Sequence, residues 1–375
     1  MTKREMIRRI EAVMSKRCPR RKDSDGKGYP WRYKAYKDDE TSISFAFEVP
    51  IGYAAKDLMQ ETDAIFAALG RPVELTDHAG IVAVKVLLKD LPLEVAAPMD
   101  LRGPSRDSVM LGYDQSMKPF FHSFRVPHLL VAGMSGYGKT DLLRWILFQL
   151  IREYSPDELW IDIIDGKGFS FLPFRNVPHV RRVVRDLAGA VTILEEAKRI
   201  QNQRSDDVWT GKVSRKAANF QWRIVLIDEA AQIAPAQMNT KEERKLAQRA
   251  DSAAAAISCV GREARVGLLY CTQRPDSTII NGQVKANMEA SLAFRTKTVS
   301  NSEIILDRPG AEKMKQEGRV IYSGKEDVTL QVPYIGDDDK WDELLDPYRI
   351  IGGDDKDGFD GGFEGEAEDY TGDLD

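Results

Sequence analysis

Cysteine is scarce in this sequence, as are long apolar runs and histidines spaced like metal ligands. The 375 residues include only three cysteines and four histidines. Three scattered cysteines are too few for a disulfide framework or a zinc site, and the histidines do not have ligand spacing. No stretch of eighteen residues is both apolar and uncharged, and the amino-terminal residues are too charged for a signal peptide. We therefore expect a cytoplasmic protein with no membrane segment and no metal held by protein side chains alone.

Charge is distributed unevenly along the chain. The net charge is −5, yet residues 1–34 contain twelve Lys/Arg against four Asp/Glu, a local charge of +8. Residues 337–375 contain three Lys/Arg against sixteen Asp/Glu, a local charge of −13. The hydrophobic content of 42% in 375 residues is enough for two domains with a sizeable core. We therefore expect a near-neutral enzyme body with a basic amino-terminal segment and an acidic tail.

The most specific motif lies at residues 133–140. Gly133 is followed after four residues by Gly138, Lys139 and Thr140, which fits the phosphate-binding P-loop at every fixed position. An apolar run precedes the motif and a helical pattern follows it, as in P-loop proteins. In such a loop, backbone N–H groups and the helix dipole bind phosphates, the lysine contacts the β- and γ-phosphates, and the threonine hydroxyl binds Mg²⁺. The predicted nucleotide-binding residues are Gly133, Met134, Ser135, Gly136, Tyr137, Gly138, Lys139, Thr140 and Asp141.

Strands that alternate with helices surround this motif and predict an α/β fold with a mainly parallel sheet covered on both faces. The apolar runs that predict these strands are 129–132, 159–164, 223–227, 267–273, 291–294 and 319–322. A helix is predicted at 186–204 and a loop at 205–220. Ligands of such sheets bind outside the carboxyl ends of the strands. We therefore expect the polar residues at those ends to surround the nucleotide, namely Asp165, Asp228, Glu229 and Gln273.

The two adjacent carboxylates at the end of one strand predict separate roles. We expect Asp228 to bind Mg²⁺, directly or through water, and Glu229 to accept a proton from the attacking water. Gln273 is placed to sense the γ-phosphate or to orient that water. The Asn-Lys-x-Asp run with which small GTPases recognise guanine is absent, so ATP is the predicted nucleotide.

Three further parts of the chain are predicted from the segments outside the P-loop domain. Apolar residues on one stripe predict a helix at 3–17, followed by a basic loop at 16–22. A strand at 43–49, a helix at 54–69 and strands at 73–75 and 81–88 predict a small α+β unit, which ends in a proline-bearing linker. The tail from 336 is rich in Asp, Glu and Gly, so we expect most of it to be disordered. The predicted domains are 1–34, 35–100, 101–335 and 336–375.

Seven runs, taken in order, resemble the FtsK/SpoIIIE family of DNA motors: 127–140, 225–230, 271–275, 284–287, 305–307, 310–312 and 321–324. The resemblance spans about residues 108 to 335. It implies a RecA-like P-loop ATPase that assembles as a hexameric ring and moves double-stranded DNA. By the same resemblance, Arg262 matches an arginine expected to reach the ATP of a neighbouring subunit, and Asp165 and Lys167 match the family's Asp-Pro-Lys turn. The small α+β unit would correspond to the family's α domain.

Some positions depart from the family pattern. Gly166 replaces the proline of the Asp-Pro-Lys turn, and Ser291 stands where many members have arginine. We also expect neither a winged-helix domain nor a membrane anchor. A compact motor that serves a plasmid, a conjugative element or a phage, with a relaxase or another DNA-processing protein as a partner, fits these departures better than chromosome segregation at a septum.

Three functions therefore stay open at the level of sequence. The first is ATP-driven translocation of double-stranded DNA. The second is a HerA-like helicase or a DNA-packaging ATPase with the same fold. The third is a nucleotide-gated scaffold that binds DNA or a relaxase without moving along DNA.

Overall fold

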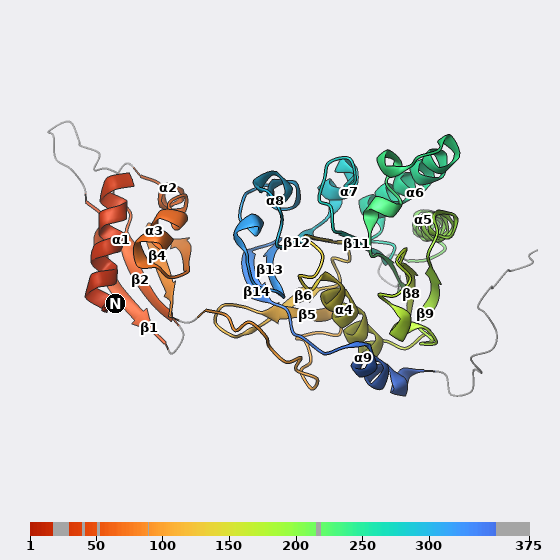
Figure 1. Cartoon of the computed structure of the whole chain (residues 1–375), viewed down its shortest axis with the longest axis horizontal. Coiled ribbons are helices and arrows are strands. Elements are labelled where there is room, and N and C mark those ends of the chain that lie inside the picture. The colour runs from red at the N-terminus through yellow and green to blue at the C-terminus, as the bar shows by residue number, and fades with distance from the viewer. Residues whose placement is uncertain (18–29, 40–41, 51–52, 89, 215–218, 350–375) are drawn as a thin grey trace, which may run out of the picture.

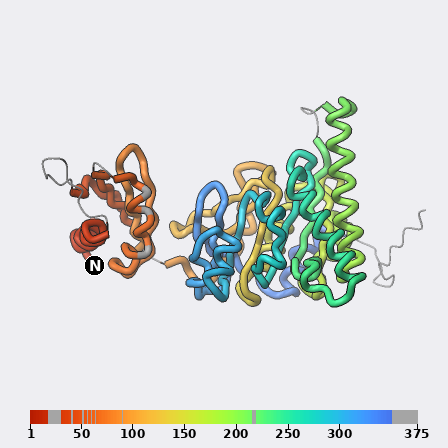
Figure 2. The backbone as a smooth tube through the Cα atoms, turned by 90° about the horizontal axis from the view of Figure 1, so that it is seen from above, coloured from red at the N-terminus to blue at the C-terminus, as the bar shows by residue number. Residues whose placement is uncertain are grey.

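The computed structural model describes residues 1–17, 30–39, 42–50, 53–88, 90–214 and 219–349, which build two sheets with separate sets of helices. The smaller sheet has four strands and the larger has ten. Figures 1 and 2 show the two parts side by side, joined by the segment that follows β4. The predicted basic loop at 16–22 lies mostly outside the described residues, as do residues 350–375.

The smaller sheet is antiparallel, in the order β1-β2-β4-β3. Met6, Ile10 and Met14 recur every four residues on the first helix and are buried, so the predicted helix at 3–17 is confirmed and its apolar stripe packs in the small core. The predicted helix at 54–69 is instead two helices separated by a turn, and the first strand was not predicted. The elements are α1 (Lys3–Arg17), β1 (Arg32–Asp38), β2 (Ser42–Glu48), α2 (Ala55–Met59), α3 (Thr62–Leu69), β3 (Val73–His78) and β4 (Ile81–Leu87).

The larger sheet has the order β6-β5-β14-β13-β12-β7-β11-β10-β8-β9. The six strands from β12 to β9 are parallel, and β13, β14, β5 and β6 add an antiparallel edge, so the mainly parallel sheet is confirmed. Its strands are β5 (Ser108–Tyr113), β6 (Pro119–Ser123), β7 (Leu129–Ala132), β8 (Leu159–Ile164), β9 (Val180–Val184), β10 (Trp222–Ile227), β11 (Val266–Thr272), β12 (Ala290–Phe294), β13 (Arg319–Ser323) and β14 (Asp327–Gln331).

Helices cover both faces of this sheet (Figure 1). The α-helices are α4 (Lys139–Glu153), α5 (Leu187–Trp209), α6 (Lys241–Val260), α7 (Gly282–Asn287), α8 (Val299–Leu306) and α9 (Asp338–Leu345). Short 3-10 turns are η1 (Leu172–Phe174), η2 (Ala230–Gln232), η3 (Pro235–Gln237), η4 (Ala311–Lys313) and η5 (Asp346–Tyr348). Helix α5 continues five residues beyond the predicted end at 204, so the predicted loop at 205–220 begins later.

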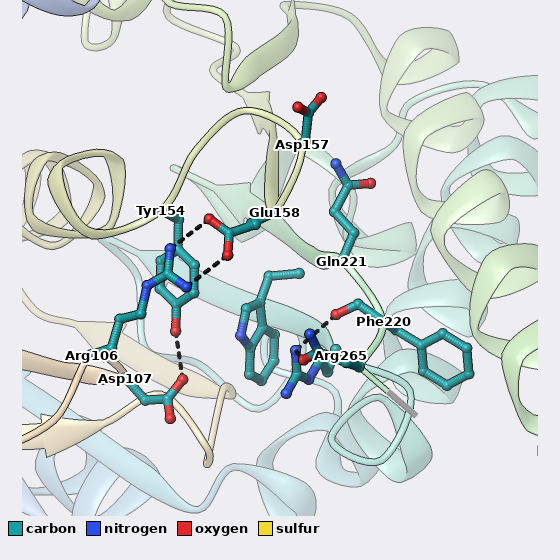
Figure 3. Close-up of a pocket in the computed structure, with 10 residues that line it drawn as sticks. Arg106, Asp107, Tyr154, Asp157, Glu158, Phe220, Gln221 and Arg265 are labelled. Carbon is teal, nitrogen blue, oxygen red and sulfur yellow. Dashed lines mark hydrogen bonds and ion pairs between the residues drawn. The ribbon is translucent and has the colours of Figure 1, made fainter. Parts of the chain in front are cut away.

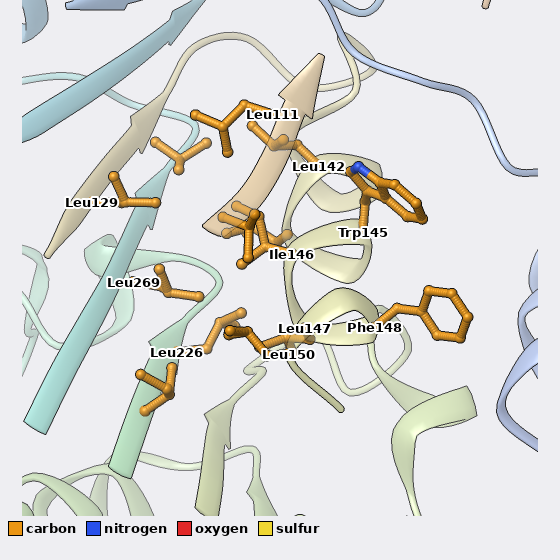
Figure 4. Close-up of a cluster of buried hydrophobic side chains, with 14 of the residues drawn as sticks. Leu111, Leu129, Leu142, Trp145, Ile146, Leu147, Phe148, Leu150, Leu226 and Leu269 are labelled. Atoms are coloured by element: carbon orange, nitrogen blue, oxygen red, sulfur yellow. The ribbon is translucent and has the colours of Figure 1, made fainter. Parts of the chain in front are cut away.

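Alternate residues of the central strands pack into two separate cores. Leu129 and Val131 of β7 face α4, whereas Leu130 and Ala132 belong to the core beneath α5 and α6. Figure 4 shows the first core, in which one side of α4 lies against β7, β10 and β11. Since β7 leads directly into the P-loop, burial of both of its faces holds that loop against the sheet.

Two segments without predicted structure pack against the large sheet. The proline-bearing segment after β4 has no helix or strand, as expected of a linker, but Leu91 is buried and the Leu91 carbonyl accepts a hydrogen bond from Arg319. The prediction of a mostly disordered tail is wrong for 338–348, where α9 and η5 form. Trp341 and Leu345 of α9 are fully buried, and Trp341 packs against Phe148 and Phe174. These two apolar side chains hold the short helix against the core.

Candidate nucleotide site

The P-loop turns at glycines that other residues could not replace without strain. Gly133 has φ = +144°, and a Cβ there would lie 2.7 Å from the Cβ of Phe294. Gly138 has φ = +95° and directly precedes the first residue of α4. Within the described chain, the backbone N–H groups of Ser135, Gly136 and Gly138 have no hydrogen-bond partner. The loop therefore presents unpaired N–H donors at the amino end of a helix, which is the arrangement that binds phosphate.

Lys139 is buried at the base of the loop. Its Nζ donates to the carbonyl of Met134 over 2.6 Å, so the ammonium group is folded back across the loop. Burial lowers the pKa of Lys139, although the negative charges of Glu229 and Asp228 oppose this effect. A phosphate group in the loop would offer the ammonium a charged partner in place of a neutral carbonyl.

Asp228 follows β10 and lies among other carboxylates. Burial raises the pKa of Asp228 to about 6, and the neighbouring charges of Asp165 and Glu229 add to the shift. The hydroxyl of Ser170 donates to Asp228 Oδ2 over 3.4 Å. Asp165, which follows β8, is buried and accepts hydrogen bonds from the backbone N–H groups of Gly168 and Phe171. In the part of the chain that the structure describes, no Lys or Arg forms an ion pair with either aspartate.

Glu229 is held in place by the end of the neighbouring strand β11. Its Oε1 accepts a hydrogen bond from the Thr272 hydroxyl over 2.7 Å, and its Oε2 accepts one from the backbone N–H of Gln273 over 3.1 Å. A third donor is the backbone N–H of Ala231. These contacts fix the carboxylate beside the P-loop strand. Sequence reasoning gave no role to Thr272, although it lies in the run 271–275, or to Ser170, which lies in none of the runs that resemble the family.

The structure brings most of the predicted site residues together. Lys139, Thr140, Asp228, Glu229 and Gln273 all lie at the carboxyl ends of the adjacent parallel strands β7, β11 and β10. Tyr137 and Asp141 border the same loop. The phenol of Tyr137 accepts a hydrogen bond from Arg295, and Asp141 lies in the first turn of α4.

Arg262 is not part of this group. It precedes β11 and therefore lies where the parallel strands begin, at the opposite end of these strands from the P-loop. It forms an ion pair of 3.2 Å with Glu289. The seven residues of β11 separate the amino and carboxyl ends of this strand by about 20 Å, at ~3.3 Å per residue. Arg262 therefore lies too far from the P-loop to reach a nucleotide bound by the same chain.

The oxygen ligands at this site fit Mg²⁺ held jointly with a nucleotide. Mg²⁺ usually binds one or two carboxylates together with substrate phosphates. Asp228 offers a buried carboxylate with no cationic partner among the described residues, and the Thr140 hydroxyl lies in the P-loop helix. In the described ranges, no group of three or more His, Cys, Asp or Glu side chains could hold a metal ion without a nucleotide.

The turn at 165–168 contains one of the departures from the family pattern. A Cβ at Gly166 would lie within about 2 Å of the terminal amide of Gln232, so a larger residue there would require that flexible side chain to move. Lys167 is exposed beside this turn. Ser291 is buried inside β12, paired with Leu130 and Ser323 in the sheet.

A separate hollow lies at the amino ends of β8 and β10, away from the P-loop (Figure 3). Apart from Asp157, its charged side chains have partners within the described part of the chain. Arg106 donates two hydrogen bonds to Glu158, Tyr154 donates to Asp107, and Arg265 donates to the carbonyl of Phe220. These pairs indicate that the hollow has a structural role.

Comparison with known proteins agrees with this geometry. Residues 94–206 match the model of the FtsK/SpoIIIE family. This segment is therefore similar to the FtsK/SpoIIIE family. The chain is 25% identical over 330 residues to the DNA translocase FtsK of Streptomyces avermitilis, a match that covers 81% of this chain and 33% of that protein. It is 26% identical over 301 residues to FtsK of Mycobacterium leprae, covering 73% of this chain and 34% of that protein. The chain thus spans about a third of the length of these relatives.

Solved structures share the fold. The conjugation coupling protein TcpA of pCW3, in a monomer form with ATPγS, has a TM-score of 0.64 at 20% identity, covering 91% of this chain and 99% of that chain. The cytoplasmic domain of the type VII secretion ATPase EccC of Thermomonospora curvata has a TM-score of 0.55 at 18% identity, covering 69% and 33% respectively. The predicted P-loop ATPase fold is therefore confirmed. None of the helices within the described ranges is long and apolar enough to cross a lipid bilayer.

Proposed function

We propose that this FtsK/SpoIIIE-type chain hydrolyses ATP and uses the energy to move double-stranded DNA. The observation that supports hydrolysis most directly is Glu229, a carboxylate fixed by Thr272 and Gln273 next to the P-loop and Asp228. A protein that only binds ATP does not need a base beside the γ-phosphate. The match of residues 94–206 to the family and the relatives named DNA translocase support DNA as the polymer that is moved.

Each residue of the proposed site has one role. The P-loop N–H groups and Lys139 bind the β- and γ-phosphates, and Thr140 and Asp228 would hold Mg²⁺. When bound, Mg²⁺ neutralises charge on the phosphate oxygens. Glu229 accepts a proton from the attacking water, and the half-buried Gln273 at the end of β11 orients that water or contacts the γ-phosphate.

The position of Arg262 supports a ring in which each ATP lies between two subunits. This arginine lies at the opposite end of the parallel strands from its own P-loop, so in this proposal it stabilises charge on the nucleotide of a neighbouring subunit. A homo-oligomer, a hexameric ring by analogy with the family, would provide that neighbour. A plasmid, a conjugative element or a phage is the proposed context, with a relaxase or a similar DNA-processing protein as a partner in the cytoplasm.

Hydrolysis measured with and without linear duplex DNA tests the function directly. We expect DNA to stimulate the wild-type rate. Glu229→Gln should still bind ATP but lose about 10²-fold or more in rate, because only the base is lost. Lys139→Ala should lose tight ATP binding as well. A wild-type protein that hydrolyses ATP equally with and without duplex would contradict translocation and support the scaffold alternative, whereas unwinding of a forked duplex would support the helicase.

Mixing inactive subunits tests the role of Arg262. Arg262→Ala and Lys139→Ala proteins should each lack activity, yet a mixture should recover some of it at interfaces where both residues are intact. The stabilisation expected of such an arginine is about 10³-fold in rate. Co-assembled mixtures without any recovered activity would argue against a role for Arg262 in a neighbouring site.

A further inference from the structure

Arg144 joins three segments that are distant in the sequence. It lies one turn after Thr140 on the P-loop helix α4 and is only 7% exposed. Its Nε donates to the carbonyl of Ser170 over 2.6 Å, and its Nη1 forms an ion pair of 2.7 Å with Asp338 of α9. The guanidinium is held at two points, and losing the Ser170 carbonyl would leave its buried Nε without a partner, whereas Asp338 is itself more than half exposed.

The Ser170 contact leads directly to the nucleotide site. While the carbonyl of Ser170 accepts from Arg144, its hydroxyl donates to Asp228 Oδ2. Ser170 belongs to the loop that begins at Asp165, whose carboxylate accepts the N–H groups of Gly168 and Phe171. The position of Arg144 therefore determines where this loop presents the Ser170 hydroxyl to Asp228.

Helix α9 in turn determines the position of Arg144. Its Trp341 is fully buried between Phe148 of α4 and Phe174 of η1, and the guanidinium of Arg144 lies 6.0 Å from the Trp341 ring centre. A second contact lies at the other end of this segment, where Arg349 donates to the carbonyl of Pro173. Helix α9 thus packs on both α4 and the segment that follows Ser170.

From these contacts we infer that Arg144 is a positioning residue for Asp228, and that Asp338 of α9 is part of the same connection. The path runs from Asp338 through Arg144 and Ser170 to the carboxylate proposed to hold Mg²⁺. This inference rests on the proposed function of Asp228. Its consequence is that a helix outside every nucleotide-binding motif sets the Mg²⁺ affinity of the site. Losing a residue that orients a metal ligand costs about 10- to 100-fold in metal affinity.

Mg²⁺ titrations of nucleotide binding in the full chain test the inference without requiring hydrolysis. The readout is the Mg²⁺ concentration that gives half of the thermal stabilisation by ATPγS. Asp338→Asn, Arg144→Lys and Ser170→Ala should each raise this concentration about 10-fold, whereas binding of a fluorescent ADP analogue in EDTA should not change. Asp339→Asn is the matched control, because it makes the same charge change in the same turn of α9 at an exposed residue that forms no ion pair with Arg144.

A double variant tests whether Asp338 and Arg144 act on the Mg²⁺ requirement through the same contact or independently. Asp338→Asn combined with Arg144→Lys should raise the Mg²⁺ requirement no further than the larger single change, because both act through the same contact. The inference is overturned if Asp338→Asn and Ser170→Ala lower the melting temperature but leave the Mg²⁺ requirement at the wild-type value. A wild-type chain that binds ATPγS with no dependence on Mg²⁺ would instead contradict the proposed role of Asp228 itself.

Discussion

Two groups of buried carboxylates lie in the same sheet, and they differ in how their charge is balanced. Beneath α5, Asp162 is 2.7 Å from Arg223 and 2.9 Å from Arg182, and both arginines also contact Glu196. At the nucleotide site, Asp165, Asp228 and Glu229 have Lys139 as their buried cation, and it donates to a carbonyl instead. The first group contains two carboxylates and three guanidinium groups, because Arg181 also lies 3.3 Å from Glu196, so its negative charge is fully balanced. The second group has an excess of negative charge.

The pKa values follow this difference. Burial alone would raise the pKa of Glu196, but the guanidinium groups of Arg223 and Arg182 lower this pKa to about 2. Burial raises the pKa of Asp228 to about 6, and the charge of Lys167, which forms no ion pair with Asp228, opposes this shift only in part. A balanced group stabilises the fold only while all of its members are present. An unbalanced group destabilises the unliganded fold and gains from binding a cation, which is the property expected of a ligand site.

Removing one member of the balanced group should have the largest effect. Arg223→Ala leaves Asp162 buried with half of its counter-charge, so the free energy of unfolding should fall by about 3–5 kcal/mol. Urea unfolding measures this loss. Arg249→Ala is the matched control, because its ion pair with Glu195 is exposed and should contribute at most about 1 kcal/mol. Equal losses in the two variants would show that the buried group is no more important than a surface pair.

Replacing an aspartate by asparagine should change the free energy of unfolding in opposite directions in the two groups. Asp228→Asn removes an unpaired buried charge, so it should raise the free energy of unfolding of the unliganded protein by about 2–3 kcal/mol. It should also remove the stabilisation by Mg²⁺ with ATPγS. Asp162→Asn should destabilise the protein instead, because Arg223 and Arg182 then lose a partner. Destabilisation by both substitutions would contradict the contrast between the groups.

His128 is a buried group that is neutral, unlike the two carboxylate groups, and it should make the free energy of unfolding depend on pH. His128 is 2% exposed, neither ring nitrogen is hydrogen-bonded to a described residue, and burial lowers its pKa to about 4. A pKa below the unfolded value of about 6.5 contributes stability that is present above that pH and is lost as the pH falls towards 4. Unfolding at pH 5 should therefore need about 2 kcal/mol less than at pH 7.5 on account of His128.

The test of this pH dependence compares two histidine variants. His128→Phe should flatten the decrease in unfolding free energy between pH 7.5 and pH 5. His78→Phe, at an exposed end of β3, should leave the decrease unchanged. If both variants retain the wild-type pH dependence, His128 does not remain neutral in the folded protein.

Short-range patterns were sufficient to predict the class of the fold and which residues the fold brings together beside the P-loop. The P-loop is contiguous, and apolar strands ending in Asp228, Glu229 or Gln273 point to one edge of a parallel sheet. Site predictions of this kind need only the local order of strand, loop and helix. The resemblance to a motor family rested on the same local runs, and the match of residues 94–206 agrees with it.

Long-range packing decided what these patterns could not show. Asp162 and Arg223 lie 61 positions apart inside apolar runs, and only the register of β8 against β10 brings them together. The tail was predicted to be disordered from its average acidic composition, which hides the contribution of individual apolar residues. Burial of Trp341 and Leu345 holds α9 in place. Residues such as Thr272, Ser170 and Arg144 depend on contacts between separate elements. The sequence alone therefore determined which chemical groups meet at the sheet edge, because chain connectivity places them there. The tertiary structure decided which charges are balanced, because that depends on partners from other elements.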